Sequence, residues 1–208
     1  MSMARQERVN VYDAAGRVAG ALPRGRALAS GRPVGAVNAL VIDARGRVLL
    51  QRRREDKENG GLWDKSVGGH VGAGESFDAC VVREAGEELF GDGTSARVRL
   101  AAGRAARRRR PWPAEPAVVL YRAGLQLNLR DVRHRPEGGF RTVIYHVALY
   151  LGRTAAPRAA FRPDPSELAG LRFFAPGAVD RLLLRGALAP NMAFLWLTQA
   201  RALLELAR

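Results

Sequence analysis

The sequence predicts a mixed α/β sandwich, in which helices cover the faces of one β-sheet. The first observation is that short runs rich in β-branched and aromatic residues stand before and after one helical segment, and that more helical segments end the chain. The second is size, because 208 residues with 47% hydrophobic content suffice for one good core but not for two full domains. We therefore expect one folded domain with elaborations.

The first half of the chain begins with extended segments. Residues 9–24 alternate short apolar runs around an Asp-Ala-Ala-Gly turn and predict a hairpin. Residues 35–53 predict two apolar strands that are separated by a turn at 43–46, and the second strand ends in arginines. After a loop, residues 62–71 return to extended structure and lead into a glycine-rich stretch.

A helix is predicted from Ser76 to Phe90, because its apolar residues recur with a spacing that buries one side. Ser76 is a suitable N-cap, and Gly91 and Gly93 can end the helix. Residues 104–116 contain three prolines and predict an exposed loop. The remaining expected elements are strands at 96–103, 117–129, 141–152 and 171–176, a helix at 178–186 and a last helix from about Pro190.

The hydrophobic runs and the cysteine content indicate where in the cell the protein is found. No apolar run reaches the roughly 18 to 20 residues that a membrane-spanning helix needs, and the N-terminus lacks the apolar segment of a signal peptide. The single cysteine, Cys80, cannot form an internal disulfide or build a cysteine metal site, and its helical apolar surroundings predict a buried thiol. We therefore expect a cytoplasmic protein.

The chain is strongly basic, with a formal net charge of +14 that favours anionic partners such as nucleic acid or phosphorylated metabolites. Among the 34 basic residues, Lys57 and Lys65 are the only lysines and the rest are arginines. A GC-rich coding bias explains arginine in place of lysine. It does not explain the excess of basic over acidic residues, so an electropositive surface is expected.

Against this background, three carboxylates gather on the predicted helix. Glu88 lies four positions after Glu84, and Glu87 lies three positions after Glu84, so all three share one helical face. Like charges at this spacing repel each other, and a divalent cation relieves the repulsion. Magnesium, a hard ion that takes oxygen ligands and substrate phosphate oxygens, suits such a cluster.

The segment before the helix, "SVGGHVGAGE", supports a phosphate or metal site. Its glycines allow backbone groups to approach an ion closely, and the helix N-terminus nearby favours anions. Arg83 lies within the acidic group and can pair with Glu75 or Glu87. A solvated acidic helix face is the alternative, which the combination of glycine loop, arginine and three carboxylates disfavours.

These residues also resemble the box of the Nudix family, with the pattern G-x5-E-x7-R-E-U-x-E-E-x-G-U, where U is aliphatic. The matching positions, in register, are Gly69, Glu75, Arg83, Glu84, Ala85, Glu87 and Glu88. The pattern departs at its end, where Phe90 takes the glycine position and Gly91 the last aliphatic one. The flanking order of strands, from about Val34 to the helix after Phe174, is also similar to a Nudix fold.

The resemblance implies a Nudix-type α/β/α sandwich with a mixed β-sheet. On this basis we expect an N-terminal hairpin extension at 1–33, a Nudix hydrolase domain at 34–188, and a C-terminal helix at 189–208 that packs on the same domain. The implied activity is a Mg²⁺- or Mn²⁺-dependent pyrophosphohydrolase that cleaves the diphosphate of a nucleoside diphosphate derivative or a related compound.

The resemblance also implies roles for residues. Glu84, Glu87 and Glu88 hold the metal and the carbonyl of Gly68 can join them, while Glu75 and Arg83 brace the loop against the helix. A carboxylate accepts the proton of the attacking water. This general base is Glu87 in the box or a glutamate outside it, and the outside candidates are Glu115, Glu137 and Glu167, with Glu167 preferred.

Several residues are candidates for substrate contacts, each beside a plainer interpretation. His70 binds phosphate or is a packing residue, and one of Arg52, Arg53 and Arg54 binds phosphate or all three are solvated. Trp63 is expected in the core or as a loop anchor, and the alternative is that it stacks on a base. Four arginines lie close to Trp112, namely Arg107, Arg108, Arg109 and Arg110. They resemble a nucleic-acid contact, which would make RNA a partner, and the alternative is a charged loop without such a role. The N-terminal hairpin and the last helix could each support a homodimer.

Two other functions stay open at this point. The stretch around residues 62–76 also resembles Nudix proteins of the isopentenyl-diphosphate isomerase branch, which carry a cysteine just before the box. Here that position is Gly68, and Cys80 lies on the helix and cannot replace the thiol. The second alternative is a non-catalytic Nudix domain that binds a nucleotide or RNA, which the complete set of glutamates disfavours.

Overall fold

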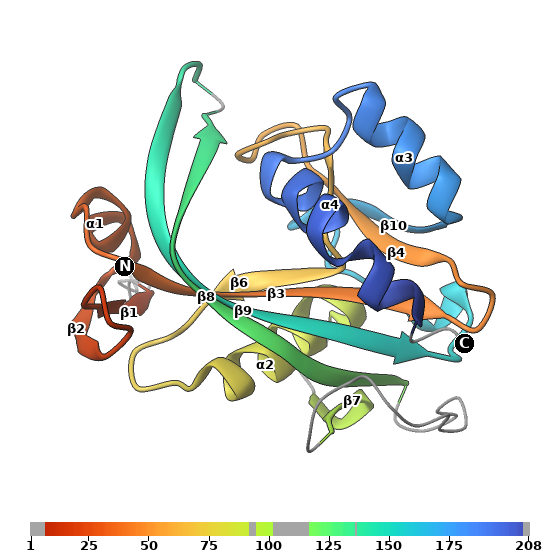
Figure 1. Ribbon diagram of the computed structural model, residues 1–208, viewed down its shortest axis with the longest axis horizontal. Helices are drawn as coiled ribbons and strands as arrows, with labels where there is room; N and C mark the ends of the chain where they lie inside the picture. Colours follow the sequence, from red (N-terminus) through yellow and green to blue (C-terminus); the bar gives the residue numbers. More distant parts are fainter. Residues whose placement is uncertain (1–6, 92–94, 102–116, 136, 206–208) are drawn as a thin grey trace.

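The computed structural model describes residues 7–91, 95–101, 117–135 and 137–205, and Figure 1 shows the arrangement of their helices and strands. The strands are β1 Arg8–Tyr12, β2 Val18–Pro23, β3 Val34–Asp43, β4 Val48–Arg53, β5 Trp63–Asp64, β6 Val67–His70, β7 Val98–Leu100, β8 Val118–His134, β9 Phe140–Thr154 and β10 Leu168–Phe174. The helices are α1 Arg24–Ala29, α2 Phe77–Phe90, α3 Pro176–Leu184 and α4 Pro190–Glu205, with 3-10 turns at Ser95–Arg97 and Arg158–Ala160. Within these ranges, no helix is long and apolar enough to cross a membrane.

The strands form one mixed sheet, which confirms the predicted fold class. The central path runs β10-β4-β3-β9-β8-β7, and β5 and β6 pair with β4 and β3 beside it. The pairs β3 with β9 and β7 with β8 are parallel, and the other pairs are antiparallel. The sheet is strongly curled, with β3, β6 and β9 running through its middle (Figure 1).

Strand β3 shows why helices are needed on both faces. All ten of its residues are buried, as expected for a strand covered on each side. Alternate side chains divide between two cores: Leu40 and Ile42 pack with the side of α3 and α4, whereas Ala39 and Val41 pack with α2. Helix α4 contributes to the first core a run of buried residues that includes Met192.

The N-terminal hairpin forms as predicted, because β1 and β2 pair antiparallel around a turn at residues 13–16. Strand β1 also pairs with β3, where Val11 faces Val34, so the hairpin continues the sheet. The ring of His146 holds its turn, since Nε2 lies 2.7 Å from the carbonyl oxygen of Asp13. The division of the chain into residues 1–33, 34–188 and 189–208 stays a prediction.

The largest difference from the expected elements is the length of the β8–β9 ribbon. The sequence predicted strands at 117–129 and 141–152, but β8 reaches His134 and β9 begins at Phe140. Charged residues such as Asp131 and Arg133 concealed the extension, although both are largely buried there. The extra length of β8 matters because it includes Arg133, which lines the cavity described below.

Candidate functional site

Helix α2 forms where the sequence places it. The hydroxyl of Ser76 accepts a hydrogen bond from the Ala79 N–H at 3.1 Å, which satisfies a free donor at the helix start. At the other end Gly91 adopts the left-handed conformation, with a φ of +69°, and its N–H donates to the carbonyl of Glu87. Cys80 and Leu89 are buried against the sheet, and this packing fixes the direction in which the other side of the helix, with its glutamates, faces.

Two carboxylates of α2 lie against strand β6. Glu88 Oε2 accepts a hydrogen bond from the Gly68 N–H at 2.8 Å. Glu84 lies over Gly69 so closely that a Cβ built there would be 1.9 Å from the Glu84 carboxyl carbon. Burial is the main cause that raises the pKa of Glu84 to about 7 and that of Glu88 to about 8. The charge of Arg83 opposes the rise at Glu84, whereas the charge of Glu84 adds to the rise at Glu88. Burial therefore disfavours the charged forms of both carboxylates, and a cation bound between them would favour those forms.

Arg83 and Glu75 connect the glycine loop to the helix. Arg83 Nε and Nη2 lie 2.9 Å and 3.0 Å from the two carboxylate oxygens of Glu75, and Nη2 also donates to the carbonyl of His70. Glu75 accepts the Gly72 N–H at 2.9 Å. Burial raises the pKa of Glu75, but the hydrogen bonds from Arg83 and Gly72 outweigh burial and leave the pKa below its usual value. This brace fixes the loop.

Arg83 also holds the acidic face itself. Its Nη1 lies 2.9 Å from Glu84 Oε1 and 3.2 Å from Glu87 Oε2. Within the described ranges, no three carboxylate, imidazole or thiol groups converge as a finished metal cluster. A cation that takes Glu84 and Glu87 must compete with the Arg83 guanidinium. The donors are hard carboxylate oxygens, two of the three carboxylates are buried, and in that respect they fit Mg²⁺ or Mn²⁺.

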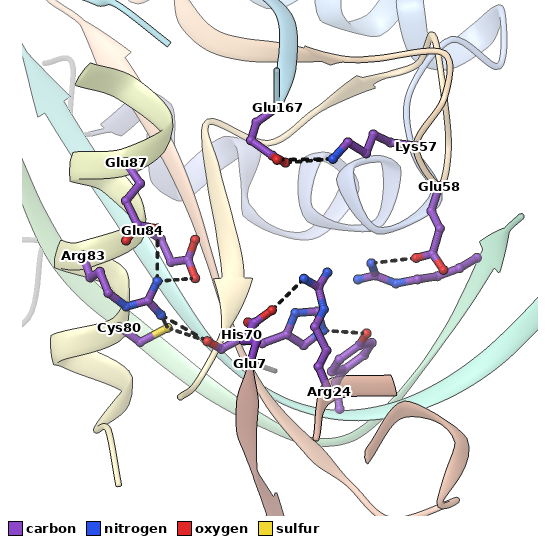
Figure 2. Close-up of polar contacts among 12 residues, drawn as sticks. Glu7, Arg24, Lys57, Glu58, His70, Cys80, Arg83, Glu84, Glu87 and Glu167 are labelled. Atoms are coloured by element: carbon purple, nitrogen blue, oxygen red, sulfur yellow. Dashed lines mark hydrogen bonds and ion pairs between the residues drawn. The ribbon is translucent and has the colours of Figure 1, made fainter. Parts of the chain in front are cut away.

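The acidic face opens into a cavity of about 930 Å³. The glutamates Glu84, Glu87 and Glu88 line it, together with Gly68 and the brace residues. Besides Arg83, five basic residues line the same cavity, and we call them the basic group: Arg24, Arg53, Lys57, Lys65 and Arg133. In Figure 2, Arg24 and Lys57 lie across strand β6 from α2. The cavity therefore brings the three glutamates and the basic group together.

The residues predicted to bind phosphate lie in different places. Arg53 lines the cavity and its Nη1 is 3.6 Å from Asp64 Oδ2. Arg52 is half-exposed beside Glu55, and Arg54 pairs with Asp56. Neither of these two arginines is among the described residues that line the cavity.

His70 lines the cavity from a buried position. Its Nε2 lies 3.2 Å from the hydroxyl of Tyr145, so the ring has a structural partner. Burial, followed by the charge of Arg24, places the pKa of His70 well below its usual value, and the ring is neutral near pH 7. The structure is thus consistent with both interpretations of His70, as a packing residue and as a cavity contact.

The three candidates for the general base that lie outside the Nudix-like box differ in their positions relative to the cavity. Glu167 lines the cavity, where its carboxylate pairs with Lys57 Nζ at 3.2 Å. Glu137 is exposed near Arg135 and does not belong to the described lining. Glu115 lies outside the described residues, as do Arg107 to Arg110 and Trp112.

Two plainer predictions are confirmed. Cys80 is fully buried, and its Sγ lies 3.3 Å from the carbonyl oxygen of His70. Trp63 packs edge-on against Phe174 with ring centroids 4.7 Å apart, and it is partly buried against the apolar core on the side of α3 and α4.

Sequence reasoning missed most of the basic group, namely Arg24, Lys57, Lys65 and Arg133. Their places in the sequence are far apart, so no local pattern joins them. One signal was nevertheless available, because both lysines of this arginine-rich chain line the cavity.

Comparisons with known proteins identify the family of this mixed α/β fold. The NUDIX domain model matches residues 32–195. The chain therefore belongs to the Nudix family, and by class it is a Nudix hydrolase.

Two relatives are similar in sequence. An uncharacterized Nudix hydrolase of Streptomyces coelicolor is 41% identical over 88 residues, which are 42% of this chain and about half, 49%, of that relative's length. The isopentenyl-diphosphate Delta-isomerase of Nocardia farcinica is 32% identical over 173 residues, or 82% of this chain and 81% of the isomerase.

Solved structures agree with the fold. The protein DR0079 of Deinococcus radiodurans has a TM-score of 0.64 and 22% identity, and the match covers 94% of this chain and 98% of that one. The NUDIX domain of Shewanella oneidensis NrtR, crystallised with ADP ribose, has a TM-score of 0.50 and 15% identity, covering 82% and 87%. At these identities the two structures bear on the fold alone.

Proposed function

We propose that this protein is a metal-dependent hydrolase that cleaves a diphosphate linkage in a nucleoside diphosphate derivative or a related compound. The observation that carries the proposal is the burial of Glu84 and Glu88 side by side in a cavity that basic residues also line. A diphosphate substrate needs both, because its anionic oxygens require cations while the hydrolytic metal requires carboxylates.

Glu84, Glu87 and Glu88, with the carbonyl of Gly68, would hold Mg²⁺ or Mn²⁺. When bound, such a metal neutralises phosphate oxygens and lowers the pKa of a coordinated water. Arg83 and Glu75 keep the glycine loop and α2 in register, so the carboxylates have one orientation. The role of the brace is positioning, since Arg83 occupies its hydrogen bonds with Glu75 and the His70 carbonyl.

The chain offers two carboxylates that can take the proton of the attacking water, Glu87 and Glu167. Attack of the water oxygen on phosphorus forms one P–O bond and breaks the bridging P–O bond of the diphosphate. The basic group then faces the negative charge that develops on the departing phosphate. Arg53 and His70 line the cavity and are the proposed substrate contacts, whereas Arg52 lies outside the lining and would need to move to join them.

The test is turnover of a panel of nucleoside diphosphate derivatives, with ADP ribose and 5′-triphosphorylated RNA included, in the presence of Mg²⁺. Glu88→Gln and a reaction with excess chelator are the controls. The proposal expects release of phosphate or nucleotide from at least one compound and none in either control. Binding of panel compounds without turnover would contradict it and would favour the non-catalytic alternative.

The similarity to the Nocardia isomerase gives a second candidate, isomerisation of isopentenyl diphosphate. Position 68 is a glycine, and the buried Cys80 thiol points to the His70 carbonyl and does not line the cavity. The chain therefore lacks a thiol at the place where the isomerase resemblance requires one. Conversion of isopentenyl diphosphate to its isomer by the purified protein would favour this second candidate.

Cytoplasmic location, homodimer formation and RNA binding through Arg107 to Arg110 also stay proposals. If those arginines bind RNA, changing all four to alanine will reduce the dependence of RNA affinity on salt concentration. An unchanged slope would contradict RNA binding by this segment.

A further inference from the structure

Lys65 is a buried cation that lines the cavity. Its side chain is only 7% exposed, and its Nζ lies 3.2 Å and 3.3 Å from the two oxygens of Asp64. The Lys65 N–H also donates to Asp64 at 2.8 Å, and Arg53 approaches the same carboxylate. Asp64 therefore fixes the ammonium in one position before any ligand arrives.

The stem of Lys65 lies across Gly68. A Cβ built on Gly68 would be 2.0 Å from Lys65 Cε and 2.9 Å from Nζ. The same Gly68 donates its N–H to Glu88. One glycine thus leaves room for the ammonium and also holds a carboxylate of the acidic face, so cation and carboxylate stand close together.

The choice of lysine at this position is informative because the chain otherwise uses arginine. Lys57 and Lys65 are the only lysines among 34 basic residues, and both line the cavity. An ammonium is a compact charge on a flexible stem, whereas a guanidinium is a broad planar fork. The narrow space over Gly68 accommodates the compact group.

We propose that Lys65 is a specificity-determining residue whose ammonium, laid across Gly68 and held by Asp64, binds a phosphoryl oxygen of the substrate's diphosphate. This inference rests on the proposed function and specifies the substrate contact that makes it possible. Because residue 68 is a glycine, the space that a side chain at this position would fill is occupied by the end of Lys65. We assign that space to phosphate recognition.

The test uses inorganic pyrophosphate as the probe and isothermal titration calorimetry with chelator present, so that no metal contributes. Lys65→Met should weaken pyrophosphate binding by about tenfold or more, the range for loss of a hydrogen bond to a charged group. Lys65→Arg should weaken it as well, because the fork does not fit. Arg45→Met, which removes one charge from an exposed turn between β3 and β4, should leave binding unchanged.

Gly68→Ala tests the geometry separately. The added Cβ displaces the flexible end of Lys65, so this variant should weaken binding about as much as Lys65→Met. The double variant Gly68→Ala with Lys65→Met should bind no more weakly than either single change. In the single variant Lys65→Met, the buried Asp64 carboxylate loses its lysine partner and the protein could misfold. The double variant Asp64→Asn with Lys65→Met removes that charge and is therefore the control for misfolding.

Pyrophosphate binding that is equal in wild type and Lys65→Met would overturn the inference, as would additive losses from Gly68→Ala and Lys65→Met. Failure of the wild type to bind pyrophosphate at millimolar concentrations would overturn it too. Hydrolysis is measured apart with the substrate panel and Mg²⁺. Lys65-dependent binding without any turnover would remove the proposed function alone, whereas turnover with an unchanged KM in Lys65→Met would remove the inference alone.

Discussion

The acidic face and the basic group line one cavity but are built in opposite ways. The acidic face comes from a single helix, where Glu84, Glu87 and Glu88 have their spacing from the backbone itself. The basic group comes from five separate segments between α1 and β8. A helix face acts as a unit, whereas dispersed residues contribute one by one.

Their electrostatic states also differ. The pKa values of Glu84 and Glu88 are raised because burial disfavours their charged forms, so their ionisation depends on a nearby cation. By contrast, members of the basic group already pair with acids, as Arg24 does with Glu7 and Lys57 with Glu167. We therefore expect changes in the acidic face to abolish activity and changes in the basic group to reduce it by degrees.

The largest effect is expected for Glu88→Gln. Glutamine keeps an oxygen that can accept the Gly68 N–H but removes the charge that a metal needs. Because a catalytic metal supplies several kcal/mol, kcat should fall by about 10³-fold. Steady-state turnover with Mg²⁺ measures this, and circular dichroism checks the fold. A fall of less than tenfold would mean that the acidic face does not act as a unit.

Gly69→Ala should come next, because its Cβ would stand where the Glu84 carboxyl group now lies. Displacement of one ligand by about 1 Å can lower a rate by about 10²-fold. Gly25→Ala is the matched control, since open space surrounds that position and its activity should equal that of the wild type. Equal activity of the two alanine variants would show that the position of Glu84 is not critical.

Glu75→Gln weakens the brace without touching the acidic face directly. It replaces the charged pair with Arg83 by a neutral contact. Partners that orient metal ligands typically contribute tenfold to hundredfold, so we expect about that loss in Mg²⁺ affinity or kcat. A Mg²⁺ titration of activity measures it. A variant with wild-type Mg²⁺ dependence and rate would leave the brace without a functional role.

The smallest effect is expected in the basic group, for Lys57→Met. Its pair with Glu167 is largely solvent-exposed, and such pairs contribute about 0 to 1 kcal/mol to stability. Thermal unfolding should therefore change little, and KM should rise by less than about tenfold. A loss as large as that of Glu88→Gln would break the distinction between the two regions.

The same contrast explains what could be predicted from the sequence. The bounds of α2, its Ser76 cap and the pairing of Arg83 with Glu75 follow from short spacings, which local geometry controls. The strands β3 and β4 and the N-terminal hairpin follow from apolar runs around turns. Local patterns therefore predicted one half of the cavity.

The other half depended on contacts distant in sequence. Arg133 reaches the cavity because the β8–β9 ribbon extends farther than its apolar residues indicated. Lys65 reaches it because Gly68 leaves room for its stem, which the letters "DKSVGG" do not reveal without coordinates. The outward position of Arg52 beside the inward Arg53 follows from alternation along β4, which could have been applied to choose between them.

The most direct measurement of the central claim is Mn²⁺ binding, followed by electron paramagnetic resonance, in the wild type and in Glu84→Gln with Glu88→Gln. Glu55→Gln, which changes an exposed carboxylate, is the control. If the acidic face of α2 holds the metal, the wild type and the control will bind Mn²⁺ and the double variant will lose that binding. Equal binding by all three proteins, or none by the wild type, would contradict the assignment of Glu84 and Glu88 as metal ligands.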